Sequence, residues 1–114
     1  MVKICMNCWD IPCSCGKHIE VGIDELIFDD ILKLNKKGYL TVFCCQGHKE
    51  FKVFDLYVML SEKYLGEVPK PLKVDRNKKC IRFCKWSDKI KDSEIEYARK
   101  SFSEWVESLP SKVI

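Results

Sequence analysis

Apolar side chains recur at helical spacing in residues 24–38. Three to four residues separate most neighbours on one face, which comprises Ile23, Leu26, Ile27, Ile31 and Leu34. That period places them on one side of an α-helix. Asp24 stands at the N-cap position, and Gly38 stands just past the last turn, where glycine commonly ends a helix. The segment predicts a helix that packs one face against a core.

A second helical pattern occupies the end of the chain. Ser93 and Glu96 have capping-box spacing, which predicts a helix start there, and Pro110 predicts its end. We expect this helix to bury one apolar face, made of Ile95, Ala98, Phe102, Trp105, Val106 and Leu109.

Between the helices the pattern changes to that of β-strands. Residues 39–45 are rich in β-branched and aromatic side chains. Residues 51–62 alternate and place one apolar row on a single side: Phe54, Leu56, Val58 and Leu60. The intervening turn predicts that these two strands pair antiparallel. Residues 72–86 predict a hairpin that turns around Asp75–Lys78.

These elements predict one α+β domain spanning residues 1–114: a small, mostly antiparallel sheet of three to four strands with two helices against it. Residues 1–22 show little periodicity and hold four cysteines. We expect a zinc-stapled, Cys-rich metal-binding segment there, followed by the α+β core at 23–114. An apolar fraction of 46% excludes a disordered chain. A core of this size is adequate but not large, so a structural metal would add stability.

The eight cysteines bear on the compartment. The N-terminal residues lack a secretory signal pattern, and no apolar run approaches the roughly 20 residues that span a bilayer. We therefore expect a cytoplasmic protein without a membrane segment, in which thiols stay reduced. Reduced cysteines in this number indicate a metal site or catalysis, and four disulfides are the alternative in an oxidising compartment.

The first cysteine cluster is Cys5-x2-Cys8-x4-Cys13-x-Cys15. Four thiols within so short a segment indicate Zn²⁺, which takes four soft ligands in a tetrahedron. Only four residues separate the two pairs, fewer than in the usual structural site. We expect zinc bound by at least Cys5 and Cys8; an iron–sulfur cluster and unpaired loop cysteines are the alternatives. His18 could replace one thiol or be an exposed bystander.

The second cluster lies at residues 43–48, FCCQGH. Cys45 and His48 have the spacing of a metal knuckle. They could equally form a reactive pair, because an imidazole beside a thiol lowers its pKa. A third interpretation is packing or turn chemistry. A single Cys₃His site could join Cys45 and His48 to Cys5 and Cys8 and leave the other two cysteines of the first cluster spare.

Charge is distributed unevenly along this chain of net charge +3. Residues 63–91 carry ten Lys and Arg against three acidic residues, whereas residues 1–32 carry two Lys against six acidic residues. The basic stretch indicates nucleic acid or an acidic protein partner, unless it is a solvated lysine-rich surface. The candidate partner-binding residues of the hairpin are Arg76, Lys78, Lys79, Arg82, Lys85 and Trp86.

Two further hairpin residues, Cys80 and Cys84, have a spacing that resembles a ligand pair. On a strand they would stand about 13 Å apart, too far to hold one ion. We expect them to be small buried or half-buried residues. Trp86 could stack on a base or pack in the core.

The stretch LNKKGYLTVFCCQGH resembles small cysteine-rich proteins of Gram-positive bacteria and their phages, a group without an assigned activity. That resemblance implies a phage-encoded modulator of host machinery such as a defence system. YLTVFCCQGH is also similar to the Y-x-T-x-x-x-C-S-G-R motif of wybutosine-synthesis tRNA methyltransferases. Tyr39, Thr41, Cys45 and Gly47 match it, whereas Gln46 and His48 replace its serine and arginine.

The sequence favours an interaction module over an enzyme, because it has no phosphate loop, no HExxH and no paired-carboxylate motif. The expected module binds zinc and contacts nucleic acid or a protein through the basic hairpin. The alternative is an enzyme that uses Cys45 and His48 as a thiol or metal site, related to RNA modification. A third possibility is an assembly protein that oligomerises through its sheet.

Overall fold

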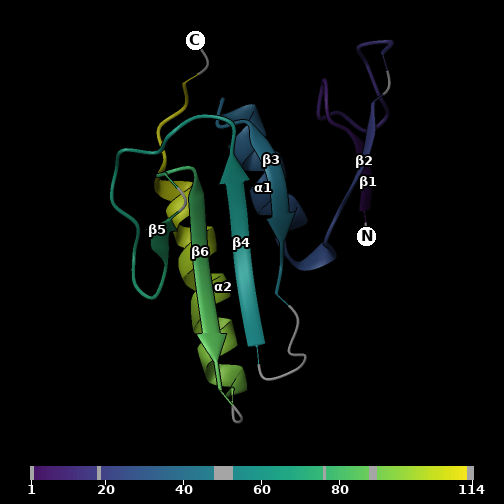
Figure 1. Cartoon of the computed structure of the whole chain (residues 1–114). Helices are drawn as coiled ribbons and strands as arrows, with labels where there is room; N and C mark the ends of the chain where they lie inside the picture. Colours follow the sequence, from purple (N-terminus) through teal and green to yellow (C-terminus); the bar gives the residue numbers. More distant parts are fainter. Residues whose placement is uncertain (1, 18, 48–52, 76, 88–89, 113–114) are drawn as a thin grey trace.

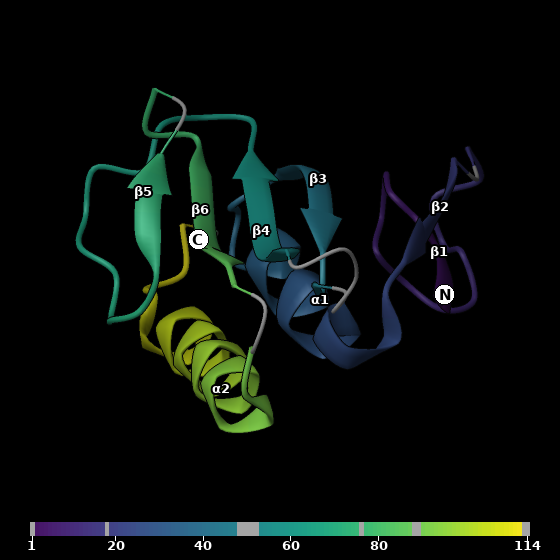
Figure 2. The ribbon, with the colours of Figure 1, turned by 60° about the horizontal axis from the view of Figure 1, so that its bottom comes forward.

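In this computed structural model, a four-stranded antiparallel sheet carries both α-helices on one of its faces (Figures 1 and 2). The structure describes residues 2–17, 19–47, 53–75, 77–87 and 90–112. The strand order is β3-β4-β6-β5, with β3 at Thr41–Cys45, β4 at Val53–Leu60, β5 at Lys73–Asp75 and β6 at Cys80–Trp86. The helices are α1, Phe28–Lys36, and α2, Asp92–Ser108. The predicted α+β class is confirmed.

The alternating pattern of β4 is the reason for its place at the centre. Its four predicted apolar residues are buried, and their neighbours are half-buried on the other face. The whole predicted apolar face of α2 is buried against this side of the sheet. As the sequence predicts, β4 pairs antiparallel with β3, and β5 pairs antiparallel with β6. β4 also pairs antiparallel with β6, which joins the two predicted hairpins into one sheet. Among the described residues, no helix combines the length and apolar character needed to cross a membrane.

The first predicted helix start is confirmed in position but not in its side-chain cap, and the second is wrong. The first helical segment opens with a 3₁₀ turn, η1 at Glu25–Ile27, and Asp24 stands at its N-cap position, but the side chain of Asp24 makes no capping hydrogen bond. This tighter turn leaves Leu26 at 61% exposure, off the predicted buried face. Asp24 instead accepts a hydrogen bond from the N–H of Gln46, which draws its carboxylate toward the end of β3. In α2 the N-cap is Lys91, so Ser93 already lies inside the first turn and does not cap it.

The end of α1 agrees with the prediction. Gly38 has φ +96°, a conformation that glycine adopts without steric cost, and its N–H donates to the carbonyl of Asn35. The N–H of Tyr39 donates to the carbonyl of Leu34, which closes the turn. The chain thus leaves the helix directly into β3.

The N-terminal segment, expected to lack regular structure, contains a β-hairpin. Its strands are β1, Val2–Cys5, and β2, Glu20–Ile23, paired antiparallel as a separate two-stranded sheet. Four residues per strand are too few to show an alternating pattern in the sequence. Ile4, Trp9 and Ile23 join the main hydrophobic core and attach the hairpin to the rest of the protein.

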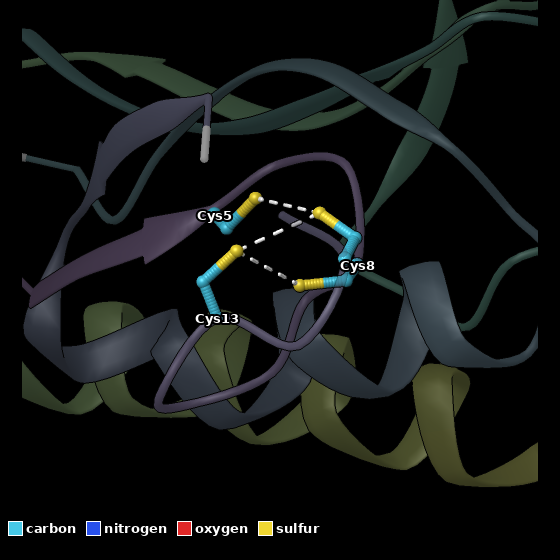
Figure 3. Close-up of side chains that lie close together, drawn as sticks. Cys5, Cys8 and Cys13 are labelled. Atoms are coloured by element: carbon cyan, nitrogen blue, oxygen red, sulfur yellow. Dashed lines mark hydrogen bonds between the residues drawn. The ribbon is translucent and has the colours of Figure 1, made fainter. Parts of the chain in front are cut away.

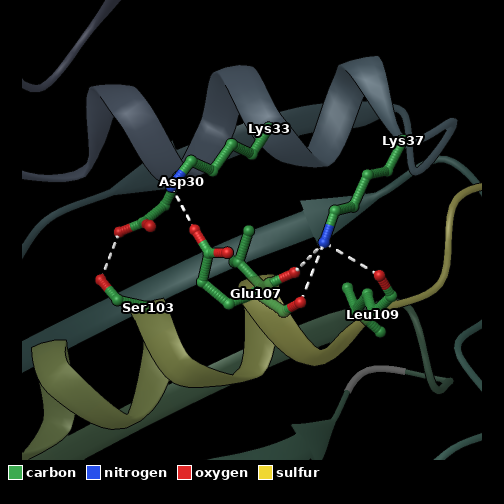
Figure 4. A network of polar contacts seen from close by, with 7 residues as sticks. Asp30, Lys33, Lys37, Ser103, Glu107 and Leu109 are labelled. Carbon is green, nitrogen blue, oxygen red and sulfur yellow. Dashed lines mark hydrogen bonds and ion pairs between the residues drawn. The ribbon is translucent and has the colours of Figure 1, made fainter.

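Polar contacts lock α1 against α2 (Figure 4). The Nζ of Lys37 donates to three carbonyls at the end of α2, those of Val106 (2.7 Å), Glu107 (3.1 Å) and Leu109 (2.9 Å). Lys33 forms an ion pair with Glu107. Ser103 donates to Asp30, whose pKa is raised because burial disfavours its charged form. Lys37 therefore caps a helix C-terminus that belongs to another element.

Lys37→Met is expected to lower the free energy of unfolding by about 1–3 kcal/mol, because three carbonyls lose a charged donor. Urea denaturation measures this loss. Lys36→Met is the matched control: Lys36 makes one long ion pair, 3.6 Å to Asp10, at an exposed position. It should cost less than about 0.5 kcal/mol. Equal losses in the two variants would contradict the capping role.

Candidate metal centre

Four cysteine sulfurs converge beside the N-terminal hairpin (Figure 3). Cys5 is the last residue of β1, and Cys8, Cys13 and Cys15 lie in the loop between β1 and β2. The Sγ–Sγ distances are 3.8 Å from Cys5 to Cys15, 3.9 Å from Cys8 to Cys13 and 3.6 Å from Cys13 to Cys15. All four sulfurs lie within 4.8 Å of one another. The structure therefore brings together all four cysteines of the first cluster.

These separations suit a single metal ion. Four sulfurs at ~2.3 Å from an ion at the corners of a tetrahedron would stand about 3.8 Å apart. All four cysteines are free thiols, so the cluster is not a pair of disulfides. A four-iron cluster would place each thiolate on a different iron and would require wider spacing. The geometry favours one tetrahedral ion with four thiolate ligands.

The backbone of the loop makes the ligand turn. The N–H of Trp9 donates to the carbonyl of Cys5 at 2.9 Å and closes the C-x2-C turn, with Trp9 at φ +58°. Trp9 tolerates this uncommon conformation while its side chain is buried in the core. Hydrogen bonds from the backbone of Ser14 and Asp10 lower the pKa of the Cys8 thiol. They favour the thiolate, which is the form that binds metal.

The centre has a buried side and an open side. Cys5 is buried and Cys15 is exposed, with the other two thiols between these extremes. Asp10 of the loop accepts a hydrogen bond from Ser14 and also pairs with Lys36 of α1. The loop thus packs against the body through Trp9 and makes a surface contact with α1 through Asp10, while the sulfur cluster stays near the surface.

Cys45 lies outside this four-sulfur group. It ends β3, and its Sγ accepts from the N–H of Gly47 at 3.4 Å. Burial raises the pKa of Cys45, and burial raises the pKa of Cys44 to about 11. A nucleophilic thiol needs the opposite shift. His48 lies outside the described residues, so its pairing with Cys45 and the shared Cys₃His site stay predictions.

The described part of the second cluster performs turn and packing chemistry. The N–H of Gln46 donates to Asp24, and the side chain of Gln46 accepts from the N–H of Leu26 at 2.9 Å. From α2, Arg99 donates to the carbonyls of Gln46 and Gly47. These contacts tie the end of β3 to the start of the helical segment and to α2.

The predicted partner-binding residues do not share one surface. Lys78 and Lys79 lie at the turn of the β5–β6 hairpin, Lys85 forms an ion pair with Glu94 of α2, and Arg76 lies outside the described residues. Arg82 contacts Asp55 at 2.7 Å and Asp75 at 3.5 Å. Trp86 is 77% exposed. The set is therefore split between the hairpin turn, the α2 side and the opposite face of the sheet.

The expectation for the two remaining cysteines holds for one of them. Cys80 is buried, whereas Cys84 is exposed. Both are on the face of β6 that carries Arg82, and neither joins a group of potential metal ligands among the described residues. Cys84 is useful as a reference thiol outside the metal centre.

Sequence reasoning missed three residues that gather around Trp86. Lys70, Lys73 and Tyr97 line one groove with it. The sequence did not reveal that Lys73 lies beside Arg82. β5 has only three residues, and the pairing of Lys73 with Arg82 depends on the strand register. Tyr97 lies outside the apolar face of α2. An aromatic residue outside that face is expected to be exposed, and this pattern could have identified Tyr97 as a surface residue from the sequence.

No protein-family model matches this chain, and comparisons with curated proteins and with solved structures find no match either. The resemblances to cysteine-rich phage proteins and to the tRNA methyltransferases therefore stay predictions.

Proposed function

We propose that this protein is a small zinc-binding interaction module. The observation that carries the proposal is the convergence of Cys5, Cys8, Cys13 and Cys15, whose sulfurs have the spacing of one tetrahedral ion. Four cysteines are a common ligand set of structural zinc sites. The lowered pKa of Cys8 supports a thiolate in the group.

The ion has a structural role in this proposal. All four positions of the tetrahedron are filled by protein, whereas catalytic zinc sites keep one position for water or substrate. An isolated two-stranded hairpin with such short strands is marginally stable in water. Zinc links the end of β1 to the loop that leads to β2, and it supplies the stability that this hairpin lacks.

The module contacts its partner through the lysine-rich end of the sheet. Lys73, Lys78 and Lys79 form no ion pair with any described residue, and the surrounding stretch 63–91 is strongly basic. Such a surface attracts an anionic partner. Arg82 contributes less net charge than the sequence suggests, because Asp55 and Asp75 neutralise it.

Native mass spectrometry of protein prepared under reducing conditions tests the metal centre. We expect one zinc per chain, lost in Cys13→Ser. Cys84→Ser, which alters an exposed thiol outside the cluster, should keep it. Cys45→Ser should keep it as well.

Two results would overturn the proposed centre. One is wild-type protein without metal. The other is loss of the ion in Cys45→Ser with retention in Cys13→Ser, which would support the shared Cys₃His site. Iron in place of zinc, detected as visible absorption, would overturn the identity of the ion and retain its ligands.

A further inference from the structure

No helix or strand of the described residues covers the face of the four-stranded sheet that lies away from α1 and α2, which is here named the open face (Figure 2). Paired residues lie side by side on the same face of an antiparallel sheet, so the strand register identifies which residues are on the open face. Phe43 pairs with Met59, and Tyr57 pairs with Arg82, which in turn pairs with Lys73. The open face thus combines aromatic and basic side chains.

Two aromatic rings on this face are exposed, and a third is exposed on the helix side of the sheet. Phe43 of β3 is 62% exposed and Trp86, the last residue of β6, is 77% exposed, whereas Tyr97 belongs to α2 and is 54% exposed. Single exposed apolar side chains are common in monomeric proteins, whereas a group of them beside one another marks an interaction surface. What groups these rings is the lining of the grooves that they share with basic side chains.

Two adjoining grooves follow the rings. The first is lined by Phe43, Tyr57, Met59 and Cys80 together with Arg82 and Asp55. The second, of about 1020 Å³, is lined by Trp86 and Tyr97 together with Lys70, Lys73 and Arg82. Arg82 belongs to both linings, so the two grooves adjoin at this residue and together make up one path.

The charged side chains that line this path are Lys70, Lys73 and Arg82 against Asp55 and Asp75, three positive charges against two negative ones, so the path favours an anionic occupant. Asp55 and Asp75 hold Arg82, and the net positive charge comes from lysines. Lys70 and Lys73 line the second groove and form no ion pair with any described residue. Lys78 extends the positive charge to the hairpin turn.

We propose that the open sheet face binds single-stranded nucleic acid, an inference that rests on the proposed interaction module and names its partner. Exposed rings stack on unpaired bases, and the lysines beside them contact phosphates. A duplex keeps its bases stacked inside and offers the rings nothing. An acidic polypeptide would use the lysines and leave the rings without a role.

Fluorescence anisotropy with a single-stranded oligothymidylate of about 12 nucleotides tests this surface. Trp86→Ala should weaken binding roughly 5- to 100-fold, because one stacking platform is lost. Trp86→Phe, which keeps a ring, should retain most of the affinity. Circular dichroism of both variants should match the wild type, because Trp86 is exposed.

The salt dependence of binding tests the lysines separately. A double variant, Lys70→Ala with Lys73→Ala, should reduce the slope of log K against log salt by about 1.4, since each phosphate contact to a single strand contributes about 0.7. The matched control removes the same charge from the N-terminal segment, with Lys3→Ala and Lys17→Ala. It should leave the slope unchanged.

Three results would overturn the inference: no binding of the oligonucleotide, binding that does not depend on Trp86, or duplex bound as tightly as the single strand. Polyglutamate is the second probe. If it binds through Lys70 and Lys73 whether or not Trp86 is present, while the oligonucleotide fails to bind, the partner is an acidic protein and the interaction module stands. If neither probe binds, the proposed interaction surface is overturned as well. The number of zinc ions per chain still tests the metal centre independently.

Discussion

Removal of the metal is expected to melt the N-terminal hairpin while the rest of the protein stays folded. β1 and β2 form a two-stranded sheet that is separate from the four-stranded sheet, and the proposed zinc would join the end of β1 to the loop between them. The apparent binding free energy of a structural zinc site is roughly 10–16 kcal/mol, far more than so short a hairpin supplies. Without the ion, the strands lose the link that holds them in register.

The core explains why the body should survive. Of the twenty buried residues that form the main cluster in the described part of the chain, the N-terminal segment supplies three: Ile4, Trp9 and Ile23. The others come from η1, α1, α2, the four-stranded sheet and the segments that join them. The body should therefore melt at a lower temperature after chelation but remain cooperative.

Amide hydrogen exchange before and after chelation measures this prediction. The N–H of Met6, which donates to the carbonyl of Ile19 beyond the ends of both strands, should lose its protection together with the amides of β1. The amides of β4 and β6 should keep theirs. Cys84→Ser provides the reference, since it should respond to the chelator as the wild type does. Loss of protection throughout the sheet at the same chelator concentration would contradict a separable hairpin.

The elements that could be predicted from the sequence are those with many turns or alternations. The 17 residues of α2 and the eight of β4 bury every apolar residue assigned to their inner faces. The short strands β1 and β2 escape such reading, because four residues fit several patterns equally well. The expected side-chain cap at Asp24 failed for another reason: its carboxylate accepts a hydrogen bond from Gln46, a partner distant in sequence, and local spacing cannot reveal that contact.

The metal centre could be predicted only in part. The spacing of Cys5 and Cys8 already indicates a ligand pair. The two remaining ligands of a four-coordinate ion could come from Cys13 and Cys15 or from Cys45 and His48. The β1–β2 pairing decides among the described candidates by folding the intervening loop back on itself. The open sheet face could not be predicted, because it depends on which side both helices occupy.

Gly47→Ala is expected to destabilise the fold by about 2–5 kcal/mol. Gly47 has φ +89°, which costs a residue with a Cβ about 1–2 kcal/mol. The added Cβ would also lie 2.3 Å from Cζ of Phe54. Phe54 is buried and cannot retreat, and Arg99 lies over its ring while donating to the carbonyl of Gly47. Overpacking of this kind adds about 1–3 kcal/mol.

Gly16→Ala separates the two costs. Gly16 has φ +77°, but a Cβ there would meet no atom within 4 Å. It should lose only the conformational term, about 1–2 kcal/mol, and thermal unfolding should show the larger shift for Gly47→Ala. The zinc content of Gly47→Ala then shows whether the turn at residues 45–47 serves packing or the metal centre. Full occupancy with reduced stability is expected if the turn packs β3 against α2, whereas loss of zinc would place this turn in the metal centre.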